Sequence, residues 1–249
     1  MHWSMSLWLF ALLLFCPHTA AAEEESVIFS GFARGWAPYE MVSDAQVHGI
    51  AVDIFKAVMP EGVHAHIEPS TKPRAKLYSN KSPIYTRLEG KEWMAGQNHF
   101  LWSDPVMHMS DALISPATSP MEYRGPGSLE GKTIACIRNY QYPTLKTLFK
   151  NKLATRYDVN KDVILLRMVK AGRVDAAVLD LRTAYWLIQK TPDLEASDFW
   201  VSATPVDSVA LRFVFNPVPS WEKHLPEINK HIQRIQSDGT LSTILSKYQ

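Results

Sequence analysis

The acid Asp180 stands at the end of an almost wholly apolar stretch, MVKAGRVDAAVLD, which covers residues 168–180. Residues 174–179 predict a buried strand that is covered on both faces, as in a parallel sheet. The helix expected over 181–190 begins directly after the acid, so Asp180 can serve as its N-cap. Its carboxylate can equally bind a cationic group of a ligand, and such a charged hydrogen bond contributes about 1.5–3 kcal/mol. The sequence leaves both roles open.

Trp36 and Tyr39 are aromatic candidates for ligand contact. Both lie in GWAPYE, a loop with Gly and Pro that follows a short apolar strand. Either ring can stack on a substrate, and tryptophan is the best ring for a cation. The alternative is an aromatic side chain that fills the edge of the core, a role that suits Tyr39 better than Trp36.

Other chemistries find little support in the sequence. GKT at 131–133 resembles the end of a phosphate loop, but Pro126 occupies the required first glycine position. His64 and His66 would share one face of a strand with no third ligand evident nearby, which favours exposed histidines over a metal site. No G-x-S-x-G motif is present. The sequence therefore predicts neither a metal nor a cofactor.

The first residues predict export. Residues 7–15 form an apolar run that is too short to span a bilayer, and small residues follow at 20–22. This pattern predicts a secretory signal peptide over residues 1–22, cleaved after Ala22, and a periplasmic protein. The alternative is lipidation at Cys16, which the bulky Phe15 before it and Pro17 after it disfavour.

The rest of the chain restricts the partners. Removal of the signal peptide leaves Cys136 as the only cysteine, in an apolar stretch typical of a buried thiol, so no internal disulfide can form. The formal net charge is +1, and no segment concentrates Lys and Arg among aromatics. Nucleic acid and acidic lipid are unfavourable partners, and we expect a monomer that binds a small molecule.

Hydrophobic patterning predicts alternating strands and helices over most of the chain. The expected strands cover 27–32, 63–67, 112–115, 132–137, 174–179 and 209–215. The expected helices lie within 49–58, 72–80, 162–171, 181–190 and 221–236, with one starting near 143 and a last short one through 248. Residues 82–96 give no clear pattern.

Four segments resemble, in order and spacing, the extracellular solute-binding proteins of family 3, best known from amino-acid ABC importers. They are GIAVDIFKAV, SLEGKTIACIRNYQYP, MVKAGRVDAAVLD and IQSDGTLSTILSKY. The resemblance implies an α/β fold of two periplasmic binding-protein lobes (type II), each a mainly parallel sheet flanked by helices, with two crossings between the lobes. We expect lobe 1 over 27–115 plus 207–249 and lobe 2 over 116–206.

The same resemblance implies roles for several residues. Asp180 falls where the family grips a ligand's α-ammonium group, beyond the carboxyl end of a parallel strand. Trp36 falls where an aromatic ring covers the ligand. Asn139 and Tyr140 in RNYQYP fall where relatives often have Gly and a small hydroxyl residue before a helix, and the bulkier Tyr140 implies a narrowed pocket. Ser103, in WSDP, belongs to the same expected ligand-binding set.

One family feature is missing. Amino-acid binders usually carry an arginine shortly before the serine-aspartate-proline segment, where it holds the ligand carboxylate through two hydrogen bonds. The corresponding stretch here is EWMAGQNHFLWSDPV, which has no arginine. Arg74 matches another arginine of many short relatives, and Arg34 and Arg87 are further candidates. For each of the three, a solvated surface position is the more frequent alternative, so the sequence departs from a standard α-amino-acid binder.

Two functional hypotheses follow from the resemblance. The first is a binding protein that captures a small polar ligand, an amino acid or a related amine or carboxylate, by hinge closure and presents it to an ABC permease or a membrane sensor. The second is an enzyme on the same scaffold, because cyclohexadienyl dehydratases resemble the family too. Glu92, Asp104 and Glu122 are the acids named for that chemistry, provided that the fold brings one into the cleft.

Overall fold

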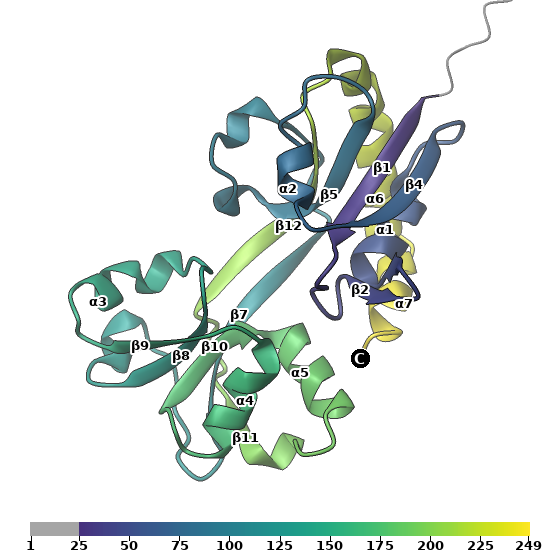
Figure 1. The fold of residues 1–249 in the computed structure, drawn as a ribbon. Helices are drawn as coiled ribbons and strands as arrows, with labels where there is room; N and C mark the ends of the chain where they lie inside the picture. Colours follow the sequence, from purple (N-terminus) through teal and green to yellow (C-terminus); the bar gives the residue numbers. More distant parts are fainter. Residues whose placement is uncertain (1–24) are drawn as a thin grey trace, which may run out of the picture.

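The computed structural model describes residues 25–249, which form two lobes joined by two long strands (Figure 1). The expected signal peptide and its cleavage site lie outside the described residues. Among the described residues, none of the helices combines the length and the hydropathy that a membrane crossing requires.

Lobe 1 is built on a sheet whose strands run parallel except at its inner edge. In spatial order the strands are β4 (His64–Ser70), β1 (Ser26–Phe32), β5 (Ile84–Gly90) and the antiparallel β12 (Asp207–Phe215). The short β6 (Leu101–Trp102) also pairs with β12, and a small hairpin combines β2 (Met41–Ser43) and β3 (Gln46–His48). The helices of this lobe are α1 (Ile50–Val58), α2 (Pro73–Lys76), α6 (Leu225–Ser237) and α7 (Thr240–Ser246), with 3₁₀ turns at Lys91–Trp93, Gln97–His99 and Pro219–His224.

Lobe 2 repeats this plan. Parallel strands β9 (Thr155–Val159), β8 (Thr133–Ile137) and β10 (Ala176–Asp180) are followed by the antiparallel β7 (Met107–Pro116), to which β11 (Phe199–Val201) also pairs. The helices are α3 (Lys146–Lys150), α4 (Asp162–Lys170) and α5 (Leu181–Lys190), with 3₁₀ turns at Pro126–Leu129, Pro143–Leu145 and Ala196–Asp198. This arrangement confirms the predicted fold class, two mainly parallel α/β lobes of the periplasmic binding-protein type II fold.

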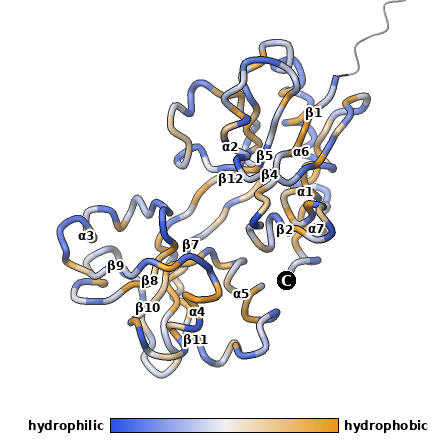
Figure 2. Tube along the Cα trace, in the orientation of Figure 1, coloured by the Kyte–Doolittle hydropathy of each residue, from blue (hydrophilic) through white to orange (hydrophobic). Residues whose placement is uncertain are grey.

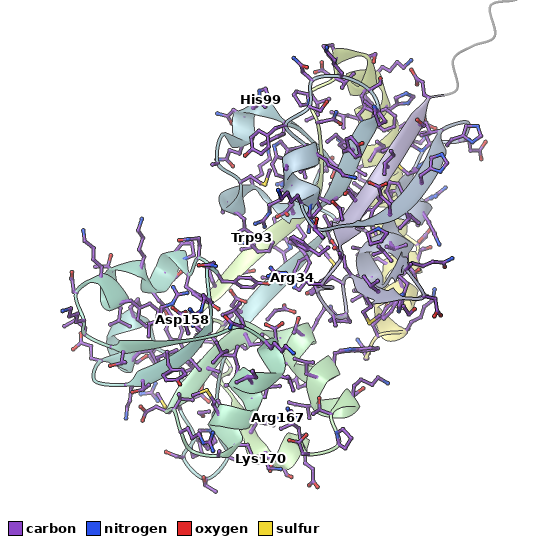
Figure 3. All side chains as sticks on the ribbon, viewed as in Figure 1. Arg34, Trp93, His99, Asp158, Arg167 and Lys170 are labelled. Atoms are coloured by element: carbon purple, nitrogen blue, oxygen red, sulfur yellow. The ribbon has the colours of Figure 1, made fainter. Side chains whose placement is uncertain are left out.

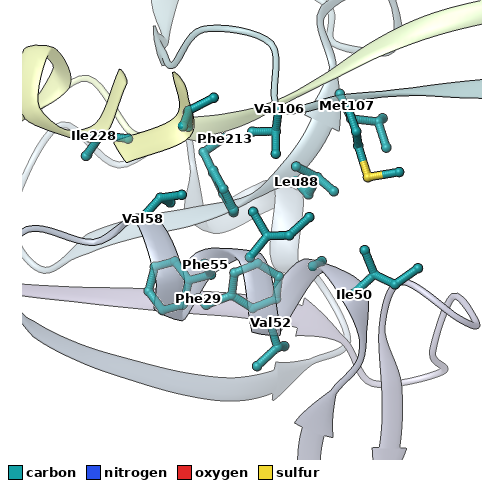
Figure 4. Packing of buried hydrophobic residues seen from close by; sticks show 14 of the residues in the cluster. Phe29, Ile50, Val52, Phe55, Val58, Leu88, Val106, Met107, Phe213 and Ile228 are labelled. Carbon is teal, nitrogen blue, oxygen red and sulfur yellow. The ribbon is translucent and has the colours of Figure 1, made fainter. Parts of the chain in front are cut away.

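Apolar side chains explain why the elements assemble in this way. In lobe 1, Phe29 of β1 packs on Phe55 of α1 with ring centroids 5.3 Å apart, and Phe213 of β12 lies 6.1 Å from Phe55 (Figure 4). In lobe 2, all five residues of β10 are buried, as a strand covered on both faces requires. Figure 2 shows this hydrophobic stretch next to that of β8.

The strands β7 and β12 pass from one lobe to the other. Met109 of β7 belongs to the core of lobe 1, whereas Ala112 belongs to a core of lobe 2. Likewise Val206, just before β12, packs in lobe 2, and Val209 packs in lobe 1. The first crossing therefore lies between Met109 and Ala112, earlier than the boundary expected after residue 115. Apolar residues on both sides of this point make one continuous strand, so the sequence pattern does not mark the change of lobe.

Local predictions differ from the structure mainly around β5. Residues 82–96 gave no pattern, yet Ile84–Gly90 forms a central strand of lobe 1. The helix expected over 72–80 is only Pro73–Lys76. Gly172, which follows α4, has a φ of 62°. That left-handed conformation ends the helix and turns the chain toward β10.

Candidate ligand-binding site between the lobes

A cavity of about 120 Å³ lies between the two lobes. Lobe 1 contributes residues from the end of β1, the loop after it, α2, β5 and the 3₁₀ turn that ends at Trp93. Lobe 2 contributes the loop after β8, the start of α4, and the junction of β10 with α5. Arg34 and Trp93, labelled in Figure 3, both line the cavity from lobe 1.

Asp180 combines the two roles that the sequence left open. Its Oδ2 accepts hydrogen bonds from the backbone N–H and the hydroxyl of Thr183, both at 2.9 Å, so the carboxylate caps α5. The residue also lines the cavity and is only 5 % exposed. Burial raises the pKa of its carboxyl above the ordinary value, although the hydrogen bonds from Thr183 and Tyr39 oppose this shift. A buried acid beside a cavity favours a cationic partner.

Two hydrogen bonds join the lobes beside the cavity. The hydroxyl of Tyr39 in lobe 1 donates to Oδ1 of Asp180 in lobe 2 at 3.2 Å. The hydroxyl of Thr183 donates to the carbonyl oxygen of Ala37 at 2.9 Å. The loop that contains Ala37 and Tyr39 is therefore in direct contact with the start of α5.

Aromatic rings form one wall of the cavity. Trp36 lines it and stacks on Tyr39, with ring centroids 4.3 Å apart and an interplanar angle of 24°. Trp93 meets Trp36 edge-on at 6.1 Å and also lines the cavity. Tyr39 is fully buried behind Trp36 and is absent from the lining, so it supports the wall instead of forming it.

Arg87 lies in a buried cluster of charges on lobe 1. Only 1 % of its side chain is exposed, so the expected solvated position is wrong for this arginine. Its Nη2 donates to Oε1 of Glu40 at 3.1 Å, and its Nε lies 2.7 Å from Oε1 of Glu89. The ring of Phe32 lies 3.8 Å from its guanidinium carbon. Burial raises the pKa of Glu40, and the charge of Arg87 acts in the opposite direction.

Arg74 reaches the same cluster from α2. Its Nε and Nη2 donate to the two carboxylate oxygens of Glu89, both at 2.8 Å. This fork-like pairing orients the guanidinium, while 45 % of the side chain stays exposed. Arg74 lines the cavity, as does Arg34, which is on the exposed loop after β1.

The opposite wall carries acids that the sequence analysis did not select. Asp111 on β7 lies next to Asp180 on β10 and Asp207 on β12, because these residues are register partners on adjacent strands. Burial, then the charges of Asp180 and Asp207, raise the pKa of Asp111 to about 7. Asp162, at the start of α4, also lines the cavity, and burial raises its pKa. The only sequence signal for Asp111 is an acid within the apolar strand MHMSDALIS.

The remaining predicted residues divide into two groups. Asn139 and Tyr140 line the cavity, and Asn139 has a φ of 67°, a left-handed conformation that asparagine tolerates better than most residues. The structure does not bring Ser103 to the cavity. Its hydroxyl donates to the carbonyl oxygen of Asp104 and accepts from the backbone N–H of Phe213, so it fastens the chain within lobe 1.

The acids named from the sequence for acid–base chemistry also lie outside the cavity lining. Glu122 accepts hydrogen bonds from Trp200, Ser202 and Ala203 in lobe 2. Asp104 is held through its backbone by Asn229, and Glu92 is exposed. Within residues 25–249, no group of three or more His, Cys, Asp or Glu side chains is arranged to hold a metal ion.

Comparison with solved structures defines the class of fold. The chain superimposes on a probable amino-acid ABC transporter extracellular-binding protein from Bacillus subtilis with a TM-score of 0.70, at 16 % identity, over 90 % of this chain and 97 % of that one. A histidine kinase sensor domain with similarity to periplasmic binding proteins gives a TM-score of 0.68 at 16 % identity, over 90 % and 96 % of the two chains. An ancestral arginine-binding protein bound to arginine gives 0.63 at 18 % identity, over 90 % and 98 %.

These similarities confirm, for the fold, the resemblance to solute-binding proteins that the sequence predicted. No protein-family model matches the chain, and no curated protein matches its sequence.

Proposed function

We propose that this protein is a periplasmic solute-binding protein that captures a small polar ligand bearing an amine, such as an amino acid or a related molecule, between its lobes. The observation that carries the proposal is the cavity between the lobes, which charged and aromatic side chains of both lobes line. A ligand that contacts both walls favours the arrangement in which the lobes approach each other. The ligand-bound form would then be recognised by an ABC permease or by a membrane sensor, since the structural neighbours include an extracellular-binding protein of an ABC transporter and a histidine kinase sensor domain.

The size of the cavity restricts the ligand. Its volume of about 120 Å³ is close to the ~150 Å³ cavity that accommodates benzene in another protein. A molecule of the size of a small amino acid or diamine fits this arrangement of the lobes. A micromolar complex requires roughly 8 kcal/mol, whereas one charged hydrogen bond to Asp180 contributes about 1.5–3 kcal/mol. Several of the charged and aromatic side chains must therefore contact the ligand.

A thermal-shift screen of amino acids, diamines, polyamines and small carboxylates tests the proposal. A ligand at a hundred times its dissociation constant stabilises the folded protein by about 2.7 kcal/mol. For a chain of this length, that corresponds to a rise in melting temperature of roughly 5–10 °C. Calorimetric titration of each hit then gives its affinity and stoichiometry. A screen in which no compound shifts the transition would overturn the proposal.

An enzyme on the same scaffold is the second candidate. The observation in its favour is that Asp111 lines the cavity with a carboxyl pKa raised to about 7 by burial and neighbouring acids. A group with such a pKa can donate or accept a proton at neutral pH. Incubation with prephenate or arogenate separates the two candidates, because a dehydratase consumes these compounds and a binding protein leaves them unchanged.

A further inference from the structure

The positive charges at the cavity are largely neutralised inside lobe 1. Arg74 and Arg87 both pair with Glu89, and Arg87 also pairs with Glu40. The ring of Phe32 lies against the guanidinium of Arg87. These contacts occupy the groups that would otherwise receive a ligand carboxylate. Of the arginines lining the cavity, Arg34 has no ion pair to any residue that the structure describes.

The acids on the facing wall form no ion pair with any residue that the structure describes, although the charge of Arg34 acts on Asp162 and that of Arg182 acts on Asp180. The side chain of Asp111 makes no hydrogen bond or ion pair with any residue in the described part of the chain, although its backbone carbonyl accepts from the N–H of Val206. Within residues 25–249, the carboxylate of Asp180 bonds only to neutral groups, the hydroxyl of Tyr39 and the amide and hydroxyl of Thr183. The cavity lining formally has three arginines, Arg34, Arg74 and Arg87, and four carboxylates, Glu89, Asp111, Asp162 and Asp180, while Glu40, which is not part of the lining, bonds to Arg87. The field in the cavity therefore favours a ligand of positive net charge.

We propose that the cavity selects a small organic cation of positive net charge, and that Asp111 is the residue that makes this selection together with Asp180. The inference rests on the proposed function and specifies its ligand class. Asp111 and Asp180 are register partners on the antiparallel strands β7 and β10, so their side chains lie on the same face of the sheet within reach of one group. A primary ammonium has three N–H donors and can bond to both carboxylates. The rings of Trp36 and Trp93 in the same cavity add a favourable surface for a cation.

Binding at this pair of acids is coupled to a proton. In the ligand-free protein, burial and the charges of Asp180 on β10 and Asp207 on β12 raise the pKa of Asp111 to about 7. Other titratable groups near it are Cys136 on β8, Tyr39 in the loop of lobe 1, and Tyr142 just before the 3₁₀ turn that precedes α3. When a cation binds, the O–H bond of the protonated Asp111 breaks, the proton passes to the buffer, and the resulting carboxylate pairs with the cation. Cation affinity should accordingly rise about tenfold between pH 6 and pH 8.

Three amino acids of similar size and different charge test the selection. L-Ornithine, L-glutamine and L-glutamate carry net charges of about +1, 0 and −1 at neutral pH, and putrescine supplies a diamine without a carboxylate. Calorimetric titration at pH 8 should show L-ornithine or putrescine binding at least tenfold more tightly than L-glutamine, with L-glutamate weakest. At pH 6, titration in two buffers of different ionisation enthalpy should show release of close to one proton per cation bound.

Asp111→Asn removes the charge with little change of shape. In this variant, we expect the ratio of the affinity for the cation to the affinity for L-glutamine to fall at least tenfold. We also expect cation binding to release no proton. Asp207→Asn is the matched control, because Asp207 neighbours Asp111 on the adjacent strand but does not line the cavity. It should keep the preference. Circular dichroism confirms that both variants fold.

The outcomes separate the two levels of the argument. Equal or tighter binding of L-glutamine or L-glutamate, or an Asp111→Asn variant that keeps the full preference for the cation, overturns the selection and leaves a solute-binding protein. If none of these compounds nor any member of the wider screen binds, the proposed function itself is wrong.

Discussion

The hydroxyl of Tyr39 in lobe 1 donates a hydrogen bond to Oδ1 of Asp180 in lobe 2, at 3.2 Å across the junction of the lobes. The same carboxylate caps helix α5 through its other oxygen. One side chain thus connects the loop after β1, the end of β10 and the start of α5. Any ligand in the cavity lies next to this contact, so binding and lobe approach share a residue.

Removal of the Tyr39 hydroxyl should loosen the lobes. Tyr39→Phe keeps the ring that supports Trp36 and deletes the hydrogen bond to Asp180, which costs about 0.5–1.5 kcal/mol. The ligand-free variant should therefore populate more open arrangements, seen as a larger radius of gyration in small-angle X-ray scattering. Tyr185→Phe is the control, because Tyr185 is 48 % exposed on α5. An identical radius of gyration for Tyr39→Phe and the wild-type protein would contradict the prediction.

Two substitutions at Asp180 should separate its cap from its charge. Asp180→Ala removes the hydrogen bonds to Thr183 and should lower the free energy of unfolding by about 1–2 kcal/mol. Asp180→Asn should keep most of the cap, since asparagine is an equally good N-cap residue. Both substitutions should raise the dissociation constant of an amine-bearing ligand at least tenfold. Urea unfolding measures the first effect and calorimetry the second, and full affinity in Asp180→Asn would limit this residue to a structural role.

The buried cluster around Arg87 should be essential for folding. Arg87→Leu leaves Glu40 and Glu89 buried without that counter-charge, and loss of one partner of a buried ion pair typically costs 3–5 kcal/mol. We expect a loss of about 3 kcal/mol or more in the free energy of unfolding. Arg167→Leu is the matched control, since the Arg167–Asp193 pair is half exposed and such pairs contribute about 0–1 kcal/mol. Equal stabilities of the two variants would show that the cluster contributes no more than a surface pair.

The sequence predicted the architecture better than the site. The apolar run before Asp180 and the helix after it could be predicted because each follows one hydrophobic pattern. β5 could not, because Arg87 and Glu89 are charged residues in a central strand that pair with each other and with residues distant in sequence. Their burial depends on Glu40 and Arg74, which the folded chain brings together. A pattern of single residues contains no information on such pairing.

Within the site, the sequence motifs identified cavity residues that lie in loops or at the end of a strand. They did not identify the acid that lies where β7 crosses from one lobe to the other. Trp36, Tyr140 and Asp180 line the cavity, as the motifs indicated. Asp111 was missed because it lies in the middle of β7, where the strand passes from one lobe to the other. Ser103 lies in a recognisable motif, but its hydroxyl bonds to the backbone within lobe 1. The motif alone does not distinguish these positions.

Asp111 should also make the stability of the ligand-free protein depend on pH. Its folded-state pKa of about 7 exceeds the value of about 3.9 in an unfolded chain. Between these two values the folded protein binds more protons than the unfolded chain, so the contribution of Asp111 to stability falls as the pH rises from about 4 to 7. Asp111→Asn cannot ionise and should avoid this loss. Its melting temperature should match that of the wild-type protein near pH 4 and exceed it at pH 8.

The difference between the pKa of Asp111 in the folded protein, about 7, and that in an unfolded chain, about 3.9, corresponds to about 4 kcal/mol. Partial exposure of Asp111 reduces the expected gain of Asp111→Asn at pH 8 to roughly 1–3 kcal/mol. Asp193→Asn should give no such gain, because the hydrogen bond from Arg167 lowers the pKa of Asp193 and reverses the sign of its contribution. Calorimetric melting curves of the three proteins from pH 4 to 8 measure the effect. If the wild-type and Asp111→Asn curves run parallel over this range, Asp111 ionises in the folded protein as it does in the unfolded chain, and its burial between Asp180 and Asp207 has no energetic consequence.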